Sequence, residues 1–74
     1  MNRIQRQYFK FETHIEAHKA NDYATNEIRS HNWNIDTNIK LNVLEIEGDN
    51  LEHMEMLSKY LQRLKLRLLE VMIG

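Results

Sequence analysis

The C-terminal third of the chain carries apolar residues at helical spacing. Six of them lie 3, 4, 3, 4 and 3 residues apart, which is the spacing of a heptad seam. They are Met54, Leu57, Leu61, Leu64, Leu68 and Val71. Asp49 or Asn50 is a suitable N-cap, and the bases in the second half of the segment match the helix dipole. This pattern predicts a helix over residues 50–73.

A second group of apolar residues lies on another side of this predicted helix. Leu66, Leu69 and Ile73 fall away from the seam when the segment is drawn as a helical wheel. A helix with two apolar faces requires two partners, and the rest of the chain covers one face. We therefore predict a homodimer with the six seam residues as its interface.

Residues 37–47 show the alternation of a strand. The apolar positions are odd-numbered at first and even-numbered afterwards, and the change falls at Val43–Leu44. We interpret the segment as one strand with a bulge at this point, ended by Gly48.

Two patterns overlap between residues 6 and 17. Phe9 and Phe11 begin an alternation that leaves the charged side chains on one face, which is typical of a half-buried strand. A helix is also possible, because four apolar residues are spaced 4, 3 and 4 apart: Ile4, Tyr8, Phe11 and Ile15. We favour the strand and keep the helix as the alternative. The sequence leaves the structure of residues 19–36 open, and within this range residues 21–35 are polar and compatible with a short helix capped at Asp22.

These elements predict a single α+β domain over residues 1–74. A two-stranded antiparallel sheet, made of the N-terminal strand and strand 37–47, packs on the long C-terminal helix 50–73. The protein is expected to be dimeric through that helix.

Size and composition support an oligomer. A chain of 74 residues and 9.0 kDa buries only ~60% of the surface that its unfolded form exposes, and the sequence has no cysteine for a disulfide or a thiolate metal site. No apolar run approaches the ~20 residues that span a bilayer, so we expect a cytoplasmic protein without membrane contact.

The only metal-like pattern is weak. His14 and His18 flank Glu16, but the order differs from that of the zincin motif, and further ligands are missing. We interpret these residues as a solvated polar face and predict no metal and no cofactor.

Catalytic signals are also missing. Ser30–His31 and Thr13–His14 are only adjacent in sequence, which does not make a catalytic triad. With Gly48 and Gly74 as the only glycines, there is no phosphate-binding loop. We predict that the protein is not an enzyme.

Charge is strongly segregated although the net charge is −1. Residues 1–10 carry +3, residues 11–40 carry −2, residues 41–58 carry −5 and residues 59–74 carry +3. The five acids of the negative block are Glu45, Glu47, Asp49, Glu52 and Glu55. Spaced carboxylates can imitate a phosphate array, so we predict that these five residues bind a basic protein surface.

The alternative function is direct DNA binding. A small dimeric regulator would use a basic N-terminus and the C-terminal helix, with Arg3, Arg6, Lys59, Arg63 and Arg67 on the phosphates. Bases in the second half of a helix are also explained by the helix dipole, and this makes direct nucleic-acid binding the less favoured hypothesis.

The short chain, the acidic block 45–55 and the leucine-rich basic segment 61–69 together resemble the small host-takeover proteins of lytic phages that infect Gram-positive bacteria. Among these, the chain is most similar to inhibitors of the host DNA polymerase sliding clamp. The resemblance implies a non-catalytic, DNA-mimicking inhibitor of replication in the bacterial host cytoplasm. It would act as an acidic dimer that obstructs the basic channel of the clamp.

Clamp-binding peptides begin with glutamine and end with a leucine–phenylalanine pair. Residues 62–66, Gln-Arg-Leu-Lys-Leu, match this only in part, because the phenylalanine is missing and the segment lies in a predicted helix. The resemblance therefore implies obstruction of the channel and not docking in the peptide cleft of the clamp.

Overall fold

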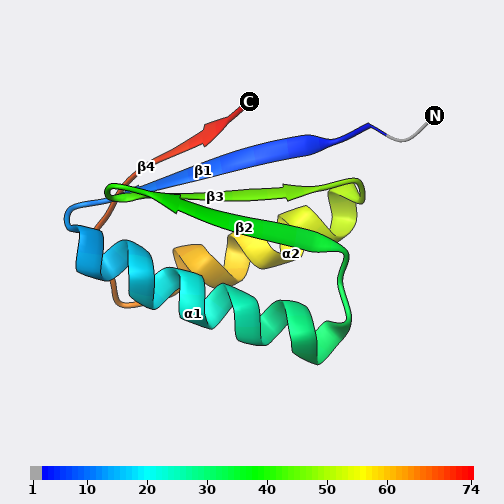
Figure 1. The fold of residues 1–74 in the computed structure, drawn as a ribbon, viewed down its shortest axis with the longest axis horizontal. Helices are drawn as coiled ribbons and strands as arrows, with labels where there is room; N and C mark the ends of the chain where they lie inside the picture. Colours follow the sequence, from blue (N-terminus) through cyan, green and yellow to red (C-terminus); the bar gives the residue numbers. More distant parts are fainter. Residues whose placement is uncertain (1–2) are drawn as a thin grey trace.

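A computed structural model describes residues 3–74, which form a four-stranded antiparallel sheet and two helices (Figure 1). The elements are β1 (Gln5–Phe11), α1 (His14–His31), β2 (Ile35–Lys40), β3 (Val43–Gly48), α2 (Leu51–Gln62) and β4 (Leu68–Ile73). The strands lie in the order β2-β3-β1-β4. This βαββαβ order is the split βαβ topology. The prediction of a two-stranded sheet packed on a long C-terminal helix is therefore wrong, because the sheet has four strands and two shorter helices cover it.

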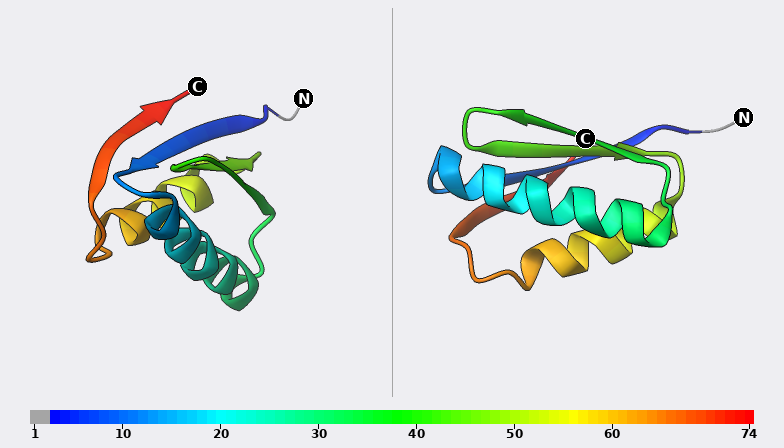
Figure 2. Two further views of the ribbon diagram at one scale, coloured as in Figure 1. Left: turned by 60° about the vertical axis from the view of Figure 1, so that its left-hand side comes forward. Right: turned by 60° about the horizontal axis from the view of Figure 1, so that its bottom comes forward.

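The two helices form one layer and the sheet forms the other (Figure 2). Both helices cover the same face of the sheet, and the opposite face is left open. The core lies between the layers and is centred on β1 and β3, where Phe9, Phe11, Leu44 and Ile46 are fully buried. Within residues 3–74, neither helix is long and apolar enough to cross a membrane.

The segment predicted as one bulged strand is a hairpin. β2 and β3 pair with Ile39 opposite Leu44, and only Leu41 and Asn42 connect them. The residues of β2 that face the core are odd-numbered, and those of β3 are even-numbered. A two-residue turn produces this change, because it places an odd-numbered residue of one strand opposite an even-numbered residue of the other. The change of parity at Val43–Leu44 was therefore the signal of a turn and not of a bulge.

The N-terminal region contains both predicted patterns, one after the other. The strand ends at Phe11, and Thr13 caps α1 by accepting a hydrogen bond from the Glu16 backbone N–H at 3.2 Å. The helix continues for 18 residues through the stretch in which a short helix capped at Asp22 was expected. It was hard to detect because its buried face consists largely of small residues. These are Ala17, Ala20 and Ala24.

The predicted helix 50–73 ends eleven residues early. Asn50, one of the two residues expected at this position, is the N-cap of α2. Its side chain accepts a hydrogen bond from the His53 backbone N–H at 3.1 Å. Beyond Gln62 the chain forms a loop and then β4, which pairs with β1. Residues 63–67 form a turn and bends, and the chain is extended only from Leu68, so the heptad spacing continued across a loop into a strand.

Leu41 occupies a backbone conformation that is unfavourable for leucine. Its φ is 58°, and its side chain is 75% exposed, so little packing offsets the strain. Leu41→Gly is expected to raise the free energy of unfolding by about 1 kcal/mol, measured by urea denaturation. Lys40→Gly, an exposed control within β2, should lower it. A loss of stability in Leu41→Gly would contradict this prediction.

Candidate functional site

The open face of the sheet presents side chains in cross-strand rows. One row contains Asp36, Glu47 and Arg6 from β2, β3 and β1. The next contains Asn38, Glu45, Tyr8 and Met72, and the third contains Lys40, Val43, Lys10 and Glu70. The face is therefore acidic toward the start of β2 and more basic toward the β2–β3 turn.

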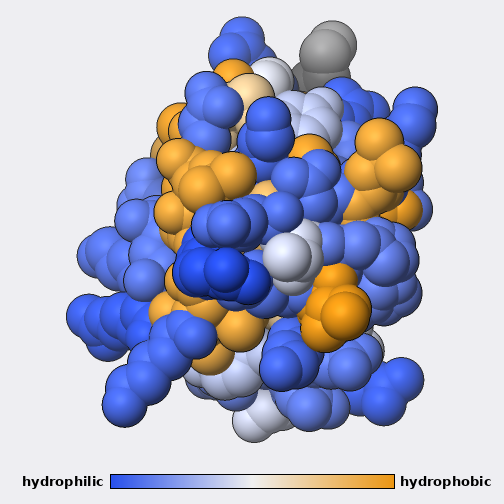
Figure 3. Space-filling view, turned by 90° about the vertical axis from the view of Figure 1, so that its left-hand side faces the viewer, coloured by the Kyte–Doolittle hydropathy of each residue, from blue (hydrophilic) through white to orange (hydrophobic). Residues whose placement is uncertain are grey.

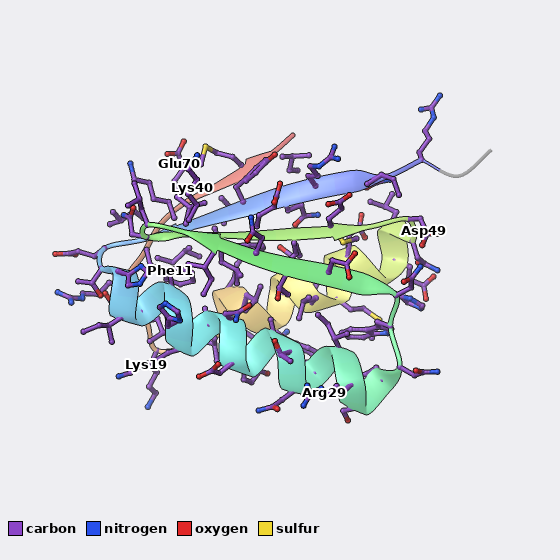
Figure 4. The ribbon with its side chains drawn as sticks, in the orientation of Figure 1. Phe11, Lys19, Arg29, Lys40, Asp49 and Glu70 are labelled. Carbon is purple, nitrogen blue, oxygen red and sulfur yellow. The ribbon has the colours of Figure 1, made fainter. Side chains whose placement is uncertain are left out.

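Acids from three elements meet at one end of the molecule. Asp36 lies directly opposite Glu47, Asp49 follows β3, and Glu52 lies in the first turn of α2. We call these four residues the acidic end. Figure 4 shows Asp49 there, at the far end of the sheet from Lys40. Asp36, Asp49 and Glu52 are exposed and Glu47 is partly buried, so their carboxylates can be reached by a partner.

The structure separates the five acids that the sequence grouped together. Glu47, Asp49 and Glu52 belong to the acidic end, and Glu45 lies in the adjacent row of the open face. Glu55 instead lines a groove between α2 and β4 on the helix side of the sheet. Sequence reasoning missed Asp36, because only the register of β2 on β3 brings it beside Glu47.

Arg6 partly neutralises the acids of β3. Its guanidinium lies 3.4 Å from the Glu47 carboxylate and 3.8 Å from that of Glu45. About half of the Arg6 side chain is exposed, and such solvent-exposed pairs contribute little to stability. The two pairs with Arg6 therefore orient the carboxylates of Glu45 and Glu47 and leave them accessible to a partner.

The predicted dimer seam does not form one exposed surface. Met54, Leu57 and Leu61 are fully buried in the core of the single chain. Leu64 packs against this core from the loop after α2, and Leu68 and Val71 belong to β4. The homodimer stays a prediction, but the buried members of the seam are already occupied by their own chain.

Glu16 holds the start of α1 to the chain leading into β4. Its carboxylate accepts hydrogen bonds from the Arg67 backbone N–H at 2.8 Å, from the Arg67 Nε at 3.2 Å and from the Thr13 hydroxyl at 2.9 Å. The backbone bond and then the side-chain bond from Arg67 lower the pKa of Glu16 from 4.5 to about 2. The Glu16 carboxylate is therefore occupied by structural hydrogen bonds and does not join His14 and His18 in a common site.

His14 and His18 lie one helical turn apart on the exposed side of α1. Their Nε2 atoms are 2.9 Å apart, and His14 Nδ1 contacts the Leu41 carbonyl, which requires Nδ1 to carry a proton. No group of three potential metal-ligating side chains occurs among residues 3–74. The pair is consistent with a hydrogen-bonded surface contact between α1 and the β2–β3 turn.

Exposed hydrophobic side chains are dispersed at the end of the molecule that bears this turn. Figure 3 shows several hydrophobic groups there, separated by polar side chains. The large exposed ones in the chain include Leu41, Ile15 and Leu69. On the open face beside the turn there is also a shallow pocket of about 340 Å³, lined by Tyr8, Asn38, Lys40, Leu41, Asn42, Val43 and Glu45.

Comparison with known proteins gives no family model that matches the chain, no similar curated protein and no similar solved structure.

Proposed function

We propose that the protein is a non-catalytic binding protein that attaches through its acidic end to a basic surface of a DNA-processing protein. The observation that carries this proposal is the placement of Asp36 directly opposite Glu47. Like charges opposite each other in a sheet are destabilising, and the exposed Arg6 beside Glu47 offsets this repulsion only in part. A basic partner would relieve the repulsion and gain long-range attraction to the acids.

The bacterial sliding clamp is the specific partner that we propose. This choice rests on the resemblance to phage inhibitors of replication, and it agrees in charge, because the clamp channel that surrounds DNA is basic. Occupation of that channel by the acidic end would block access of the clamp to DNA.

Binding to the purified clamp should depend on the acidic end and on salt. The double variant Asp49→Asn/Glu52→Gln is expected to weaken binding several-fold at low salt, mainly through slower association, because both carboxylates are exposed. The variant Asp22→Asn/Glu27→Gln on α1 makes the same change in charge and serves as the control. Surface plasmon resonance at low and high salt measures both rates.

Equal binding by the site and control variants would refute the acidic end as the contact. If the native protein binds other basic proteins but not the clamp, the proposed contact stands and the proposed partner fails. Competition with duplex DNA for the clamp tests whether binding blocks the channel.

The alternative of direct DNA binding has weaker support. Arg6 pairs with Glu45 and Glu47, and Arg67 pairs with Glu12 and Glu16. These two bases also lie toward opposite ends of β1 and so do not form one basic face. We expect no mobility shift of duplex DNA at low salt, and a salt-dependent shift would favour the alternative.

A further inference from the structure

β4 is an exposed and unusually apolar edge of the sheet. Five of its six residues are hydrophobic, and Glu70 is the only charged one. Val71, Met72 and Ile73 are 36%, 37% and 81% exposed. Natural edge strands are normally protected by charges, proline or bulges, because an unprotected edge pairs with other chains. β4 has a register shift at Leu69 near its start, and this leaves only the segment 71–73 unprotected. β2, the opposite edge, shows such protection with Asp36 and Lys40.

The backbone of β4 offers unpaired hydrogen-bonding groups on its outer side. The Gly74 N–H donates to the Arg6 carbonyl at 3.1 Å, which identifies these residues as a hydrogen-bonded pair. Hydrogen-bonded and non-bonded pairs alternate along an antiparallel ladder. Met72, opposite Tyr8, therefore points its backbone groups toward β1, and those of Val71 and Ile73 point away from the sheet.

We propose that β4 pairs with β4 of a second copy of this chain, antiparallel and about a two-fold axis, so that the two sheets become continuous. An edge strand is self-complementary under this symmetry, since each outward N–H meets an outward carbonyl of the copy. The proposal replaces the helix seam with β4 as the dimer interface.

The distribution of charge along β4 permits this pairing. The axis can pass through Val71, which places Glu70 opposite Met72 of the second copy, or through Met72, which places Glu70 opposite Gly74 of the second copy. In both registers Glu70 lies opposite an uncharged residue, and the destabilising pairing of two glutamates is avoided.

The groove beside β4 has complementary charges for the same symmetry. It is lined by apolar Leu51, Val71 and Ile73, and its α2 wall carries Glu55 and Lys59 one helical turn apart. A two-fold axis reverses the direction of α2 in the second copy, so Glu55 of each copy is placed on the side of Lys59 of the other. Pairing would cover Ile73, the most exposed large hydrophobic residue of the described chain.

Light scattering coupled to size-exclusion chromatography should give the native protein twice the 9.0 kDa of one chain. Ile73→Lys introduces a charge at the interface in either register and should shift the protein to the monomer mass. Ile15→Lys, at a 66% exposed position on α1, is the matched control and should stay dimeric. Circular dichroism verifies that both variants are folded. A native monomer at micromolar concentration, or a dimeric folded Ile73→Lys, would overturn the proposal.

Single cysteines test the geometry, because the chain has none of its own. Val71→Cys or Met72→Cys, whichever residue lies on the axis, should be joined to its copy by a short bifunctional thiol crosslinker, since Cβ atoms directly opposite in an antiparallel pair lie about 4.5–5.5 Å apart. Asn38→Cys on the β2 edge should remain uncrosslinked. Crosslinking of neither β4 variant, or equal crosslinking of Asn38→Cys, would refute pairing through β4.

Discussion

Replacement of Phe9 by alanine should lower the free energy of unfolding by about 4 kcal/mol, because it leaves a cavity at the centre of the core. Phe9 is fully buried on β1, which pairs with both β3 and β4. Domains of this size have a total stability of only about 5 kcal/mol, so about 1 kcal/mol would remain and roughly one molecule in six of the variant should be unfolded at room temperature. Urea denaturation followed by Trp33 fluorescence measures the loss, since Trp33 is buried and stacks on His31 in the folded state.

Ile15→Ala is the matched control for this prediction. Ile15 is 66% exposed on α1, and its truncation should change the free energy of unfolding by less than about 0.5 kcal/mol. Equal destabilisation by Phe9→Ala and Ile15→Ala would mean that the core does not lie between the helices and the sheet.

Local patterns in the sequence were sufficient where one element dominates the pattern. The start of α2 was predicted from its cap at Asn50, and the core positions Phe9 and Phe11 from their alternation. The end of α2 could not be found in this way, because Leu64 and Leu68 continue the seam spacing into a loop and a strand. From Leu68 onward, pairing with β1 decides the structure, and this partner strand is remote in sequence.

Two local sequence patterns indicate element boundaries that the sequence analysis did not predict. Thr13 and Glu16 have the spacing of a capping box, which would have separated the strand ending at Phe11 from α1. The change of parity at Val43–Leu44 indicated a two-residue turn, but the turn lacks glycine and contains Leu41 at positive φ, which is rare for leucine. The residues of the turn therefore did not predict a hairpin, although the alternation of apolar positions on either side of the turn required one.

The candidate site was only partly predictable for a related reason. A block of charges in sequence groups residues by number, whereas a sheet groups them by register. The acidic end therefore gains Asp36 from β2 and loses Glu55 to the groove beside β4. Leu61→Asp should unfold the chain, because Leu61 is buried in the core, and it is therefore no test of a dimer through α2.

Glu16→Gln should make the protein less stable at neutral pH and should flatten the dependence of its stability on acid. The pKa of Glu16 is about 2 in the folded protein against an ordinary 4.5, so the folded state binds fewer protons between these values. The stabilisation from the carboxylate is therefore fully present above about pH 4.5 and is lost as the pH falls toward 2. Urea denaturation at a series of pH values in this window should show a steeper loss for the native protein than for Glu16→Gln.

Arg67→Ala distinguishes the two contacts that lower the pKa of Glu16. The backbone N–H of residue 67 is the larger cause, and it survives this substitution, whereas the guanidinium contact at 3.2 Å is removed. We therefore expect the stability of Arg67→Ala to depend on pH almost as strongly as that of the native protein. The stability of Glu16→Gln should depend on pH much less. If Arg67→Ala abolishes the pH dependence as completely as Glu16→Gln, the guanidinium and not the backbone bond holds Glu16 ionised, and the fold at the junction of α1 and β4 depends on that ion pair.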